Sequence, residues 1–436
     1  MVLFPHWPKF SSLSKSKNDI YNTYDACKEI LNKLGNPEQK IPPVIHIAGT
    51  NGKGSVLAHL KFLLEASGYK LHIHLSPHLI DFNERITLAG KTISDQYLYE
   101  IMERCRVAAA GHPTTLFTAT TIASFIAFAE IEADLTILEV GMGGQFDATN
   151  VIDHPLISVV TPISYDHTEF LGNSLAEIAY AKSGIIKPGC PCVFARQLEV
   201  ARKVLEVQAI KNKAPVYRQD FEWQCYEYQE KYLKFSSSGE SAIFPQSALI
   251  GEHQIDNAGV AIAAATLLKN KYGFEKITHD SISEGMQKVY WPARLEKIKS
   301  GGLFELLRPG WEAFLDGAHN EAGSEVLARW AAKGDGRPLY AIIGVTRGKD
   351  RRTFLSNLKP HIKCMYGVCV RSEIHAETSS GITEIAKSVG IPAQSSESVK
   401  DAIIDICKQY SPPGRIIICG SLYLAGDVKK INDGEI

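Results

Sequence analysis

The segment IHIAGTNGKGS (Ile45–Ser55) constrains the fold of this chain more than any other feature. An apolar run leads into a glycine-rich turn that carries Lys53, and a helical pattern follows from Ser55. Glycines let backbone N–H groups close around phosphate oxygens, the N-terminus of a helix favours an anion, and a lysine neutralises a transferred phosphoryl group. The segment predicts a phosphate-binding loop between a strand and a helix; a glycine-rich turn with an incidental lysine is the alternative. The expected nucleotide-binding residues are Gly49, Thr50, Asn51, Gly52, Lys53, Gly54 and Ser55.

The first half of the chain alternates short apolar runs with amphipathic stretches. This rhythm predicts an α/β fold whose sheet is mostly parallel and covered on both faces. The expected strands are Val44–Ala48, Leu71–Leu75, Leu135–Val140, Leu156–Thr161 and Pro191–Ala195. The expected helices are Ser55–Ser67, Asp95–Ala109, Thr118–Ile131 and Leu175–Ile185.

Later patterns indicate a second sheet and a second domain. Between Tyr217 and Leu249, apolar and polar residues alternate in two short runs, which predicts an antiparallel hairpin in a small added sheet. The helical stretch Asn257–Lys269 follows. After VYWPAR (Val289–Arg294), the strand–helix alternation resumes for about 140 residues, enough for a domain of its own. We expect two α/β domains, 1–292 and 293–436, the second with strands at Ala313–Asp316, Leu339–Gly344, Cys364–Val370 and Arg415–Gly420.

The composition excludes several classes of protein. Lys and Arg total 47 against 48 Asp and Glu, so the net charge is −1 and the chain lacks the basic field of a dedicated nucleic-acid-binding protein. No apolar run approaches the ~20 residues of a membrane span, and no run near the N-terminus is typical of a signal peptide. The nine cysteines lack the spacing of a metal site, and their odd number favours reduced thiols. We expect a cytoplasmic, monomeric protein that binds neither nucleic acid nor membrane.

The glycine-rich loop differs from the common phosphate-binding loop because Gly54 stands between Lys53 and Ser55. In this form, GTNGKGS resembles the signature of folylpolyglutamate synthase and dihydrofolate synthase, which are members of the Mur ligase superfamily. The resemblance runs from about residue 20 to residue 425, because further motifs follow in the family's order. These are SPHL (Ser76–Leu79), NERI (Asn83–Ile86), ILEVGMGGQFDATN (Ile137–Asn150), DHTEFLG (Asp166–Gly172), AKSGIIKPG (Ala181–Gly189), HQIDNA (His253–Ala258), PAR (Pro292–Arg294), DGAHN (Asp316–Asn320) and CGS (Cys419–Ser421).

The resemblance implies an ATP-dependent ligase of folate biosynthesis. Residues 1–292 would form a P-loop domain of the Mur ligase central type, and residues 293–436 a Rossmann-like α/β domain that binds glutamate. The implied substrates are L-glutamate and either dihydropteroate or a reduced folate with a polyglutamate tail. They would be joined through an acyl phosphate, with release of ADP and phosphate. Bacterial single chains of this length often serve both folate steps, so both activities are expected.

Oxygen-bearing side chains near the loop imply a magnesium site. Mg²⁺ prefers oxygen ligands and keeps several waters, so Ser55, Ser76 and Glu139 form a suitable set. By the family's pattern, His167 is a ligand of a second Mg²⁺, whereas the residue type alone would suggest a structural histidine or a general base. A surface carboxylate at Glu139 and an ordinary turn at Ser76 are the alternatives for those two residues.

Lys182 matches the lysine that CO₂ carbamylates in the Mur superfamily. The modification turns a cation into a carboxylate-like group that holds the second Mg²⁺. It needs an unprotonated amine, so the site must lower the lysine pKa through burial or nearby cations. A helical lysine facing solvent is the alternative. The preceding Ala181 departs from the family, in which Glu is common at this position.

The segment GGQFDATN (Gly143–Asn150) is implied to border the pterin ring of the substrate. Asp147 would accept hydrogen bonds from pterin N–H groups, and Phe117 would stack on the ring unless it is a plain core residue. Gln145 stands where the family usually has Arg, and Thr118 where Glu is common. These departures leave the exact substrate open.

The second half of the chain supplies further implied contacts. Asn257 would contact the adenine, since an amide offers a matching donor and acceptor. Arg294 would reach the ATP phosphates, for which a guanidinium is suited, and Asp316 would hold the ribose. The candidates for binding the glutamate carboxylates are Arg347, Lys349 and Ser421.

The DGAHN segment carries the third expected catalytic residue, after Lys53 and Lys182. His319 would lie near the transferring phosphoryl group, although the segment also reads as a strand-to-helix turn capped by Asn320. Catalysis would rest on positioning and charge neutralisation. Domain closure across Val289–Arg294 would complete the site and exclude water.

Two other functions fit parts of this pattern. Another amide ligase of the Mur superfamily would act on a non-folate carboxylate. Peptidoglycan Mur ligases, however, carry a nucleotide-sugar domain ahead of the loop, and 48 residues precede Gly49 here. A P-loop switch or binding module would not need Asn257, Arg294 and Asp316 as a second set of ATP contacts.

Overall fold

The computed structural model describes residues 7–8, 17–347 and 350–435, which form two compact units. The first unit comprises the chain up to Ala248 together with Gln254–Tyr290. The second comprises Leu249–His253 and the chain from Trp291 onward. The expected division after residue 292 lies close to the passage at Trp291, whereas the short segment Leu249–His253 has no counterpart in the sequence prediction.

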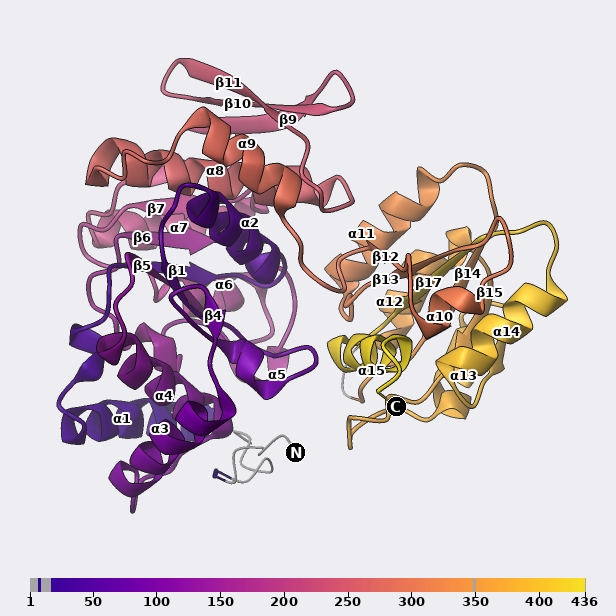
Figure 1. Cartoon of the computed structure of the whole chain (residues 1–436), viewed down its shortest axis with the longest axis horizontal. Coiled ribbons are helices and arrows are strands. Elements are labelled where there is room, and N and C mark those ends of the chain that lie inside the picture. The colour runs from indigo at the N-terminus through magenta and orange to yellow at the C-terminus, as the bar shows by residue number, and fades with distance from the viewer. Residues whose placement is uncertain (1–6, 9–16, 348–349, 436) are drawn as a thin grey trace. The chain divides into compact units, whose positions relative to one another are not determined.

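A mostly parallel sheet organises the first unit, as the alternation of elements predicts (Figure 1). Its strands are β1 (Val44–Ala48), β2 (Leu71–His74), β3 (Ile86–Leu88), β4 (Lys91–Thr92), β5 (Leu135–Glu139), β6 (Ile157–Val160), β7 (Cys192–Phe194) and β8 (Val216–Arg218). Their order is β4-β3-β2-β5-β1-β6-β7-β8, and only the pairs that involve β3 are antiparallel. The fully buried β1 lies between β5 and β6, so the glycine-rich loop leaves from the middle of the sheet's carboxyl edge.

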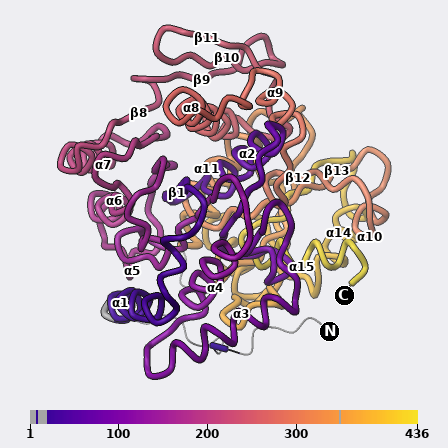
Figure 2. The backbone as a smooth tube through the Cα atoms, turned by 60° about the vertical axis from the view of Figure 1, so that its left-hand side comes forward, coloured from indigo at the N-terminus to yellow at the C-terminus, as the bar shows by residue number. Residues whose placement is uncertain are grey.

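Helices flank this sheet (Figure 2). Four of the expected helices begin and end within two residues of the observed limits, whereas α8 begins four residues before the expected Asn257–Lys269 and ends three residues after it. The helices are α1 (Lys17–Lys33), α2 (Lys53–Ala66), α3 (Asp95–Ala108), α4 (Leu116–Glu130), α5 (Thr168–Leu171), α6 (Leu175–Ser183), α7 (Glu199–Lys211), α8 (His253–Tyr272) and α9 (His279–Lys288). α4 and α8 are apolar on nearly every side, which is typical of helices buried in a core. Short 3₁₀ turns are Pro37–Gln39, Phe82–Arg85 and Ala148–Val151.

A small antiparallel sheet packs on α8 (Figures 1 and 2). It contains β9 (Trp223–Tyr228), β10 (Tyr232–Ser237) and β11 (Glu240–Pro245) in the order β11-β10-β9. The predicted hairpin is present, and a third strand extends it. The packing on α8 is close, because a Cβ at Gly259 would lie 2.6 Å from the Cβ of Cys225.

The second unit has its own sheet and core. Its strands are β12 (Glu296–Lys297), β13 (Glu312–Leu315), β14 (Leu339–Ile343), β15 (Ile362–Gly367), β16 (Ala393–Ser395) and β17 (Arg415–Cys419). The order is β12-β13-β17-β14-β15-β16, parallel except for β12. The surrounding helices are α10 (Gly302–Glu305), α11 (Glu321–Ala332), α12 (Arg351–Leu358), α13 (Ser379–Ser388), α14 (Val399–Gln409) and α15 (Leu422–Asn432), with a 3₁₀ turn at Lys359–His361.

Two further expectations concern membranes and thiols. In the described part of the chain, no helix is both long and apolar enough to cross a membrane. All nine cysteines are described, and all are free thiols, which agrees with the expectation of reduced cysteines. Only Cys369 among them is exposed.

Candidate active site

Two glycines shape the loop between β1 and α2. Gly49 and Gly52 have φ angles of 148° and 86°, in a region that favours glycine. A Cβ at Gly49 would lie 1.9 Å from the hydroxyl oxygen of Thr161, at the end of β6. A Cβ at Gly52 would lie 2.7 Å from the amide oxygen of Asn257, in the first turns of α8. The loop is therefore enclosed by β6 on one side and α8 on the other.

Hydrogen bonds to the segment after β6 fix the middle of the loop. The backbone N–H groups of Thr50 and Asn51 donate to the carbonyl of Pro162, at 3.0 and 3.3 Å. The Thr50 hydroxyl donates to the carbonyl of Ser164 at 3.0 Å and accepts from its N–H at 3.1 Å. These bonds fix the middle of the loop against the segment that follows β6.

Two lysine side chains converge on the loop. Lys53 Nζ lies 3.3 Å from the carbonyl oxygens of both Gly49 and Thr50. Lys182 Nζ, from α6, donates to the Gly49 carbonyl at 2.9 Å. Lys182 is 4% exposed, and burial, helped by the charge of Lys53, lowers its pKa to about 7. The side chain thus points inward rather than into solvent, with the lowered pKa that a carbamate requires.

The candidate magnesium ligands lie at the ends of adjacent strands. Glu139 ends β5, is 6% exposed and pairs in register with Ile47 of β1. Ser76 follows β2, on the other side of β5, and its N–H lies 3.4 Å from a carboxylate oxygen of Glu139. Ser55 is buried in the first turn of α2. A carboxylate and two hydroxyls at one edge of a sheet suit Mg²⁺, which prefers oxygen.

Two side-chain hydrogen bonds through Gln254 link Ser55 to Asn257. Gln254 donates to the Ser55 hydroxyl at 3.4 Å, and the Asn257 amide donates to Gln254 at 3.0 Å. All three residues are buried. Sequence reasoning missed Gln254, although its three-residue spacing from Asn257 places both on one face of a helix.

His167 precedes α5 in an unusual backbone conformation. Its φ is 51°, and its N–H donates to the Asp166 carboxylate at 2.9 Å. Left-handed backbone at a residue other than glycine often occurs at functional sites. Among the described residues, no group of three or more His, Cys, Asp and Glu side chains is arranged to hold a metal, so hydroxyl or carbamate ligands would have to complete any site.

Asp147 is buried and organises the loop that carries it. Its carboxylate accepts hydrogen bonds from the N–H of Met142 at 2.9 Å and from the N–H and hydroxyl of Thr149 at 3.0 and 2.6 Å. The Thr149 hydroxyl also contacts His46 Nε2 at 2.9 Å. Burial raises the pKa of Asp147 against the effect of these bonds.

The same loop packs tightly against α6, which carries Lys182. The N–H of Gln145 donates to the Ala181 carbonyl at 2.8 Å. A Cβ at Gly184 would lie 2.3 Å from the Cα of Gln145. Because the bond between Gln145 and Ala181 joins their main chains, it does not depend on either side chain.

Phe117 and Thr118 lie in the first turn of α4. Phe117 is half-buried, and a Cβ at Gly141 would lie 2.6 Å from its ring. Thr118 is buried, and its N–H donates to the Thr115 hydroxyl at 3.1 Å. Phe117 therefore lies beside the start of the loop that contains Asp147, while Thr118 serves the cap of the helix.

Glu84 belongs to the NERI motif, but the sequence analysis assigned no role to it. Its carboxylate accepts from the N–H groups of Leu79, Ile80 and Asp81, at 2.7, 2.9 and 2.9 Å. These bonds close the segment that follows Ser76. The capping-box spacing of Asp81 and Glu84 is the signal that could have identified this residue.

In the second unit, Asp316 and Arg294 lie together. The buried Asp316 carboxylate accepts from the N–H groups of Leu295 and Ala318, at 2.7 and 2.8 Å. Burial raises its pKa, and the nearby Arg294 opposes this shift. A Cβ at Gly317 would lie 2.9 Å from Arg294 Nη1.

The loops after β13 and β17 meet at one edge of this sheet. His319 Nδ1 lies 2.9 Å from the carbonyl of Gly317, and Asn320 caps α11. Ser421 is 4% exposed and caps α15, and the N–H of the preceding Gly420 donates to the Ala318 carbonyl at 2.9 Å.

Two other residues, Arg347 and Lys349, were expected to bind the carboxylates of the glutamate substrate. Arg347 follows β14 at the same carboxyl edge, is 63% exposed, and lies 3.9 Å from Glu377. Lys349 lies outside the described residues.

Comparison with known proteins identifies what this chain resembles. The family model described as "Mur ligase middle domain" matches residues 47–265, and "Dihydrofolate synthetase, C-terminal domain" matches residues 304–431. The chain is 33% identical to a dihydrofolate synthase/folylpolyglutamate synthase of Bacillus subtilis, over 92% of this chain and 93% of the relative. It is 34% identical to a similarly named protein of Mycobacterium tuberculosis, over 76% of this chain and 71% of the relative. The structure of Mycobacterium tuberculosis folylpolyglutamate synthase complexed with ADP and AMPPCP superposes with a TM-score of 0.81 at 29% identity, covering 94% of this chain and 95% of that one.

Proposed function

Because the chain belongs to the dihydrofolate synthase and folylpolyglutamate synthase family of Mur-type ligases, we propose that it joins L-glutamate to dihydropteroate, to a reduced folate, or to both, at the expense of ATP. A carboxylate is a poor acylating agent. Its attack on the γ-phosphate of ATP forms an acyl phosphate and releases ADP. The amine of glutamate then displaces phosphate and leaves an amide.

The arrangement of Lys53 and Lys182 around the carbonyl of Gly49 is the observation that supports this proposal most strongly. Lys53, whose Nζ lies 3.3 Å from the Gly49 carbonyl oxygen, would neutralise the transferring phosphoryl group. Lys182 is buried beside it and has a pKa of about 7, so much of it is uncharged at neutral pH. A simple P-loop switch has no need of a second, neutral lysine at its loop.

Ser55, Ser76 and Glu139 would hold one Mg²⁺, which when bound would neutralise charge on the phosphates. His167 and a carbamylated Lys182 would hold a second. To form the carbamate, neutral Nζ adds to the carbon of CO₂, an N–C bond forms, and one proton leaves the nitrogen. The interior position of Lys182 supports this role because it disfavours the protonated amine.

The other proposed contacts divide between substrates. Asn257, Arg294 and Asp316 would bind the adenine, phosphates and ribose of ATP, and His319 would lie near the transferring phosphoryl group. Phe117 and Asp147 would border the pterin. Arg347, Lys349 and Ser421 would receive the carboxylates of glutamate.

A product assay tests the proposal. Purified protein is given ATP, Mg²⁺ and L-glutamate with dihydropteroate or tetrahydrofolate in parallel, and both phosphate and the glutamylated product are measured. Product from both substrates is the expected result. Product from tetrahydrofolate alone would restrict the protein to polyglutamylation. No glutamate-dependent phosphate release with either would favour another Mur-type ligase that acts on a non-folate carboxylate.

A further inference from the structure

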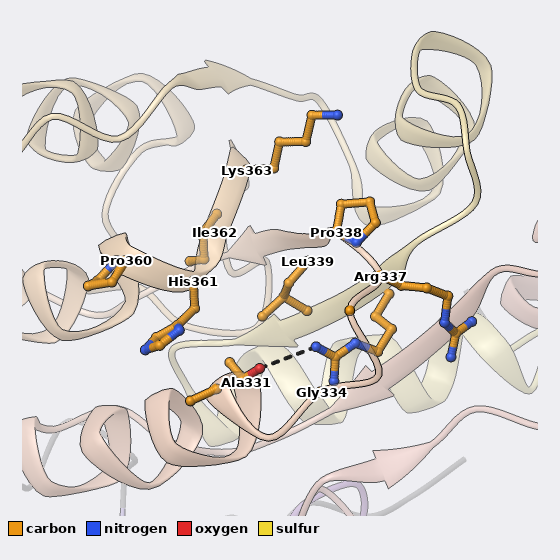
Figure 3. Close-up of a pocket in the computed structure, with 12 residues that line it drawn as sticks. Ala331, Gly334, Arg337, Pro338, Leu339, Pro360, His361, Ile362 and Lys363 are labelled. Carbon is orange, nitrogen blue, oxygen red and sulfur yellow. Dashed lines mark hydrogen bonds between the residues drawn. The ribbon is translucent and has the colours of Figure 1, made fainter.

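Among the described residues, two buried side-chain nitrogens have no hydrogen-bond partner, Arg415 Nε and His46 Nδ1. Arg415 borders a hollow of about 380 Å³ where β14, β15 and β17 begin (Figure 3). The arginines of this hollow are matched by carboxylates, since Arg337 donates to Asp335 at 2.7 Å and Asp335 also lies 3.9 Å from Arg415. The charge around Arg415 is thus balanced within the second unit, and His46 is the residue whose bonds indicate a function.

His46 lies in β1, three residues before Gly49, and its side chain is fully buried. In the register of the sheet it pairs with Leu138 of β5 on one side and with Ser158 of β6 on the other. Burial, together with the nearby charge of Lys187, lowers the pKa of its ring to about 3. The ring is therefore neutral at physiological pH and carries one proton, on either Nδ1 or Nε2.

The hydrogen bonds of Thr149 decide which ring nitrogen carries the proton. The Asp147 carboxylate is an acceptor, because the N–H groups of Met142 and Thr149 donate to its two oxygens. A hydroxyl has a single hydrogen, and that of Thr149 is donated to Asp147 at 2.6 Å. The Thr149 oxygen must then accept from His46 Nε2, which lies 2.9 Å away. His46 is thus the Nε2–H tautomer, and the unpartnered Nδ1 is the nitrogen without a proton.

The order of these bonds gives His46 control over the Thr149 hydroxyl. A bare nitrogen facing Thr149 would compete with Asp147 for the hydroxyl proton. Thr149 is fully buried, so solvent cannot readily replace a lost donor. The strand that leads into the glycine-rich loop therefore also holds the carboxylate of the loop Gly141–Asn150.

We propose that His46 is a positioning residue for pterin binding. Its Nε2–H holds the Thr149 hydroxyl, and through that hydroxyl the Asp147 carboxylate, in the orientation that receives the pterin. This inference rests on the function proposed above, because it needs Asp147 at the pterin site. No proton is transferred, so the role of His46 is to orient its neighbours.

Two amide variants test the role of the donor, because they differ in reach. In His46→Gln the amide nitrogen can take the place of Nε2, whereas in His46→Asn it reaches only the place of Nδ1. His46→Gln should keep the KM for the pterin substrate that the wild type uses, dihydropteroate or tetrahydrofolate, near the wild-type value. His46→Asn should raise this KM about tenfold, as expected for loss of one buried hydrogen bond. The KM for ATP should change little in both proteins.

His72→Asn is the matched control. His72 is also fully buried in the sheet, but its ring bonds to the main chain, with Nε2 2.8 Å from the Ile131 carbonyl and Nδ1 3.2 Å from the Ala89 nitrogen. This variant should lower the melting temperature without raising the KM for the pterin. Melting temperatures of all variants separate a loss of stability from a loss of binding.

A spectroscopic measurement on the wild type does not depend on the variants' folding. In protein labelled with ¹⁵N-histidine, the NMR signals that disappear in His46→Gln should show a protonated Nε2 and a bare Nδ1. A proton on Nδ1, or equal pterin KM values for His46→Gln and His46→Asn, would overturn this inference alone. Wild-type protein that forms no glutamylated product from either pterin would overturn the proposed function, and this inference with it.

Discussion

Two lysine side chains, those of Lys53 and Lys182, lie within hydrogen-bonding distance of one carbonyl oxygen, that of Gly49. Two cations so close repel each other, and Lys182 is also buried. Both effects favour the neutral amine, and burial is the larger. At this position the protein keeps a nucleophilic nitrogen whose protonation changes near neutral pH.

The first prediction concerns stability. The folded-state pKa of Lys182 is about 7, whereas an unfolded lysine titrates near about 10.4, so between these values only the unfolded chain holds the proton. Stability should therefore rise with pH in this window, by at most about 1.4 kcal/mol per pH unit. Urea unfolding at pH 7 and pH 9 in CO₂-free buffer should show this gain for the wild type and not for Lys182→Met. Parallel pH dependence in both proteins would refute it.

A second prediction concerns the carbamate. Lys182→Ala removes the amine and leaves a space, so ligation should be lost and partly restored by short free carboxylic acids such as acetate or propionate. Phosphate release at increasing acid concentration measures the rescue. Lys182→Arg, which keeps the charge and fills the space, should not be rescued. Normal turnover of Lys182→Ala without additives would remove the carbamate role.

Asp147 gives the third prediction. Asp147→Ala should raise the KM for dihydropteroate more than the KM for ATP. Loss of one buried hydrogen-bonding carboxylate should weaken the binding of dihydropteroate by on the order of 1.5–3 kcal/mol. Steady-state kinetics with each substrate varied measures both constants. Thr149→Val is the comparison, because it keeps the carboxylate and removes one of its hydrogen bonds. An equal effect of the two variants on the KM for dihydropteroate would mean that Asp147 acts by holding the loop.

The sequence predicts the chemistry of single residues better than their partners. A lysine in a glycine-rich loop and an acid at a strand end follow from local pattern. The hydrogen bonds from Met142 and Thr149 to Asp147 do not, because they depend on how a loop folds back on itself. The Gln254 link between Ser55 and Asn257 likewise joins segments far apart in the sequence.

At the scale of elements, the loop Gly141–Asn150 is held by its neighbours as much as by its own bonds. Tyr21 of α1 packs edge-on against Phe146, with ring centres 4.4 Å apart. On the other side, Gly184 at the end of α6 allows Gln145 to approach. A substitution in α1 or α6 that alters this packing should therefore shift Asp147, the proposed pterin contact.

Gly184→Ala is the fourth prediction. The φ of Gly184 is −60°, so alanine fits the backbone, but its Cβ would lie 2.3 Å from the Cα of Gln145. Main chain must move, which should lower the free energy of unfolding by about 1–3 kcal/mol and raise the KM for dihydropteroate. Urea unfolding and kinetics measure the two effects. Gly302→Ala is the control, since its nearest neighbour would be 3.7 Å away, and an equally small effect of both would contradict the argument.

Elements with a buried apolar face were predictable, and exposed edge strands were not. The five strands expected in the first half are all present, with ends shifted by at most one residue. The sequence analysis missed β3, β4, β8, β11, β12 and β16, and all of these except β3 lie at the edge of their sheets. β3 is buried but only three residues long, too short to show a periodic pattern. Edge strands bury little surface, and β8 has no fully buried residue, so no apolar pattern marks them.

At the scale of the whole molecule, each unit has its own sheet and core. The alternation of elements predicts two such units, because each sheet needs helices to cover it. It could not predict that Leu249–His253 belongs with the second, since so short a segment has no pattern of its own. Within that unit, a Cβ at Gly251 would lie 3.3 Å from Leu295.

The fifth prediction separates folding of the whole chain from nucleotide binding. Lys53→Ala should abolish ligation but leave the melting temperature without ATP near that of the wild type, because glycines and main-chain bonds hold the loop. ATP with Mg²⁺ should raise the melting temperature of the wild type, and the rise should largely vanish in the variant. Lys61→Ala, in the same helix, is the control. Near-normal turnover of Lys53→Ala would remove the phosphate-cradle assignment.

The central strand of the second unit has a consequence for synthesis of the chain. β17 lies between β13 and β14, yet it is made after every other strand that the structure describes. All of the first unit precedes Trp291, so it can fold while translation continues, whereas the sheet of the second unit cannot close before β17 is made. A stop codon before Arg415 would leave β12-β13 and β14-β15-β16 as two half-sheets with exposed edges, which are prone to aggregate.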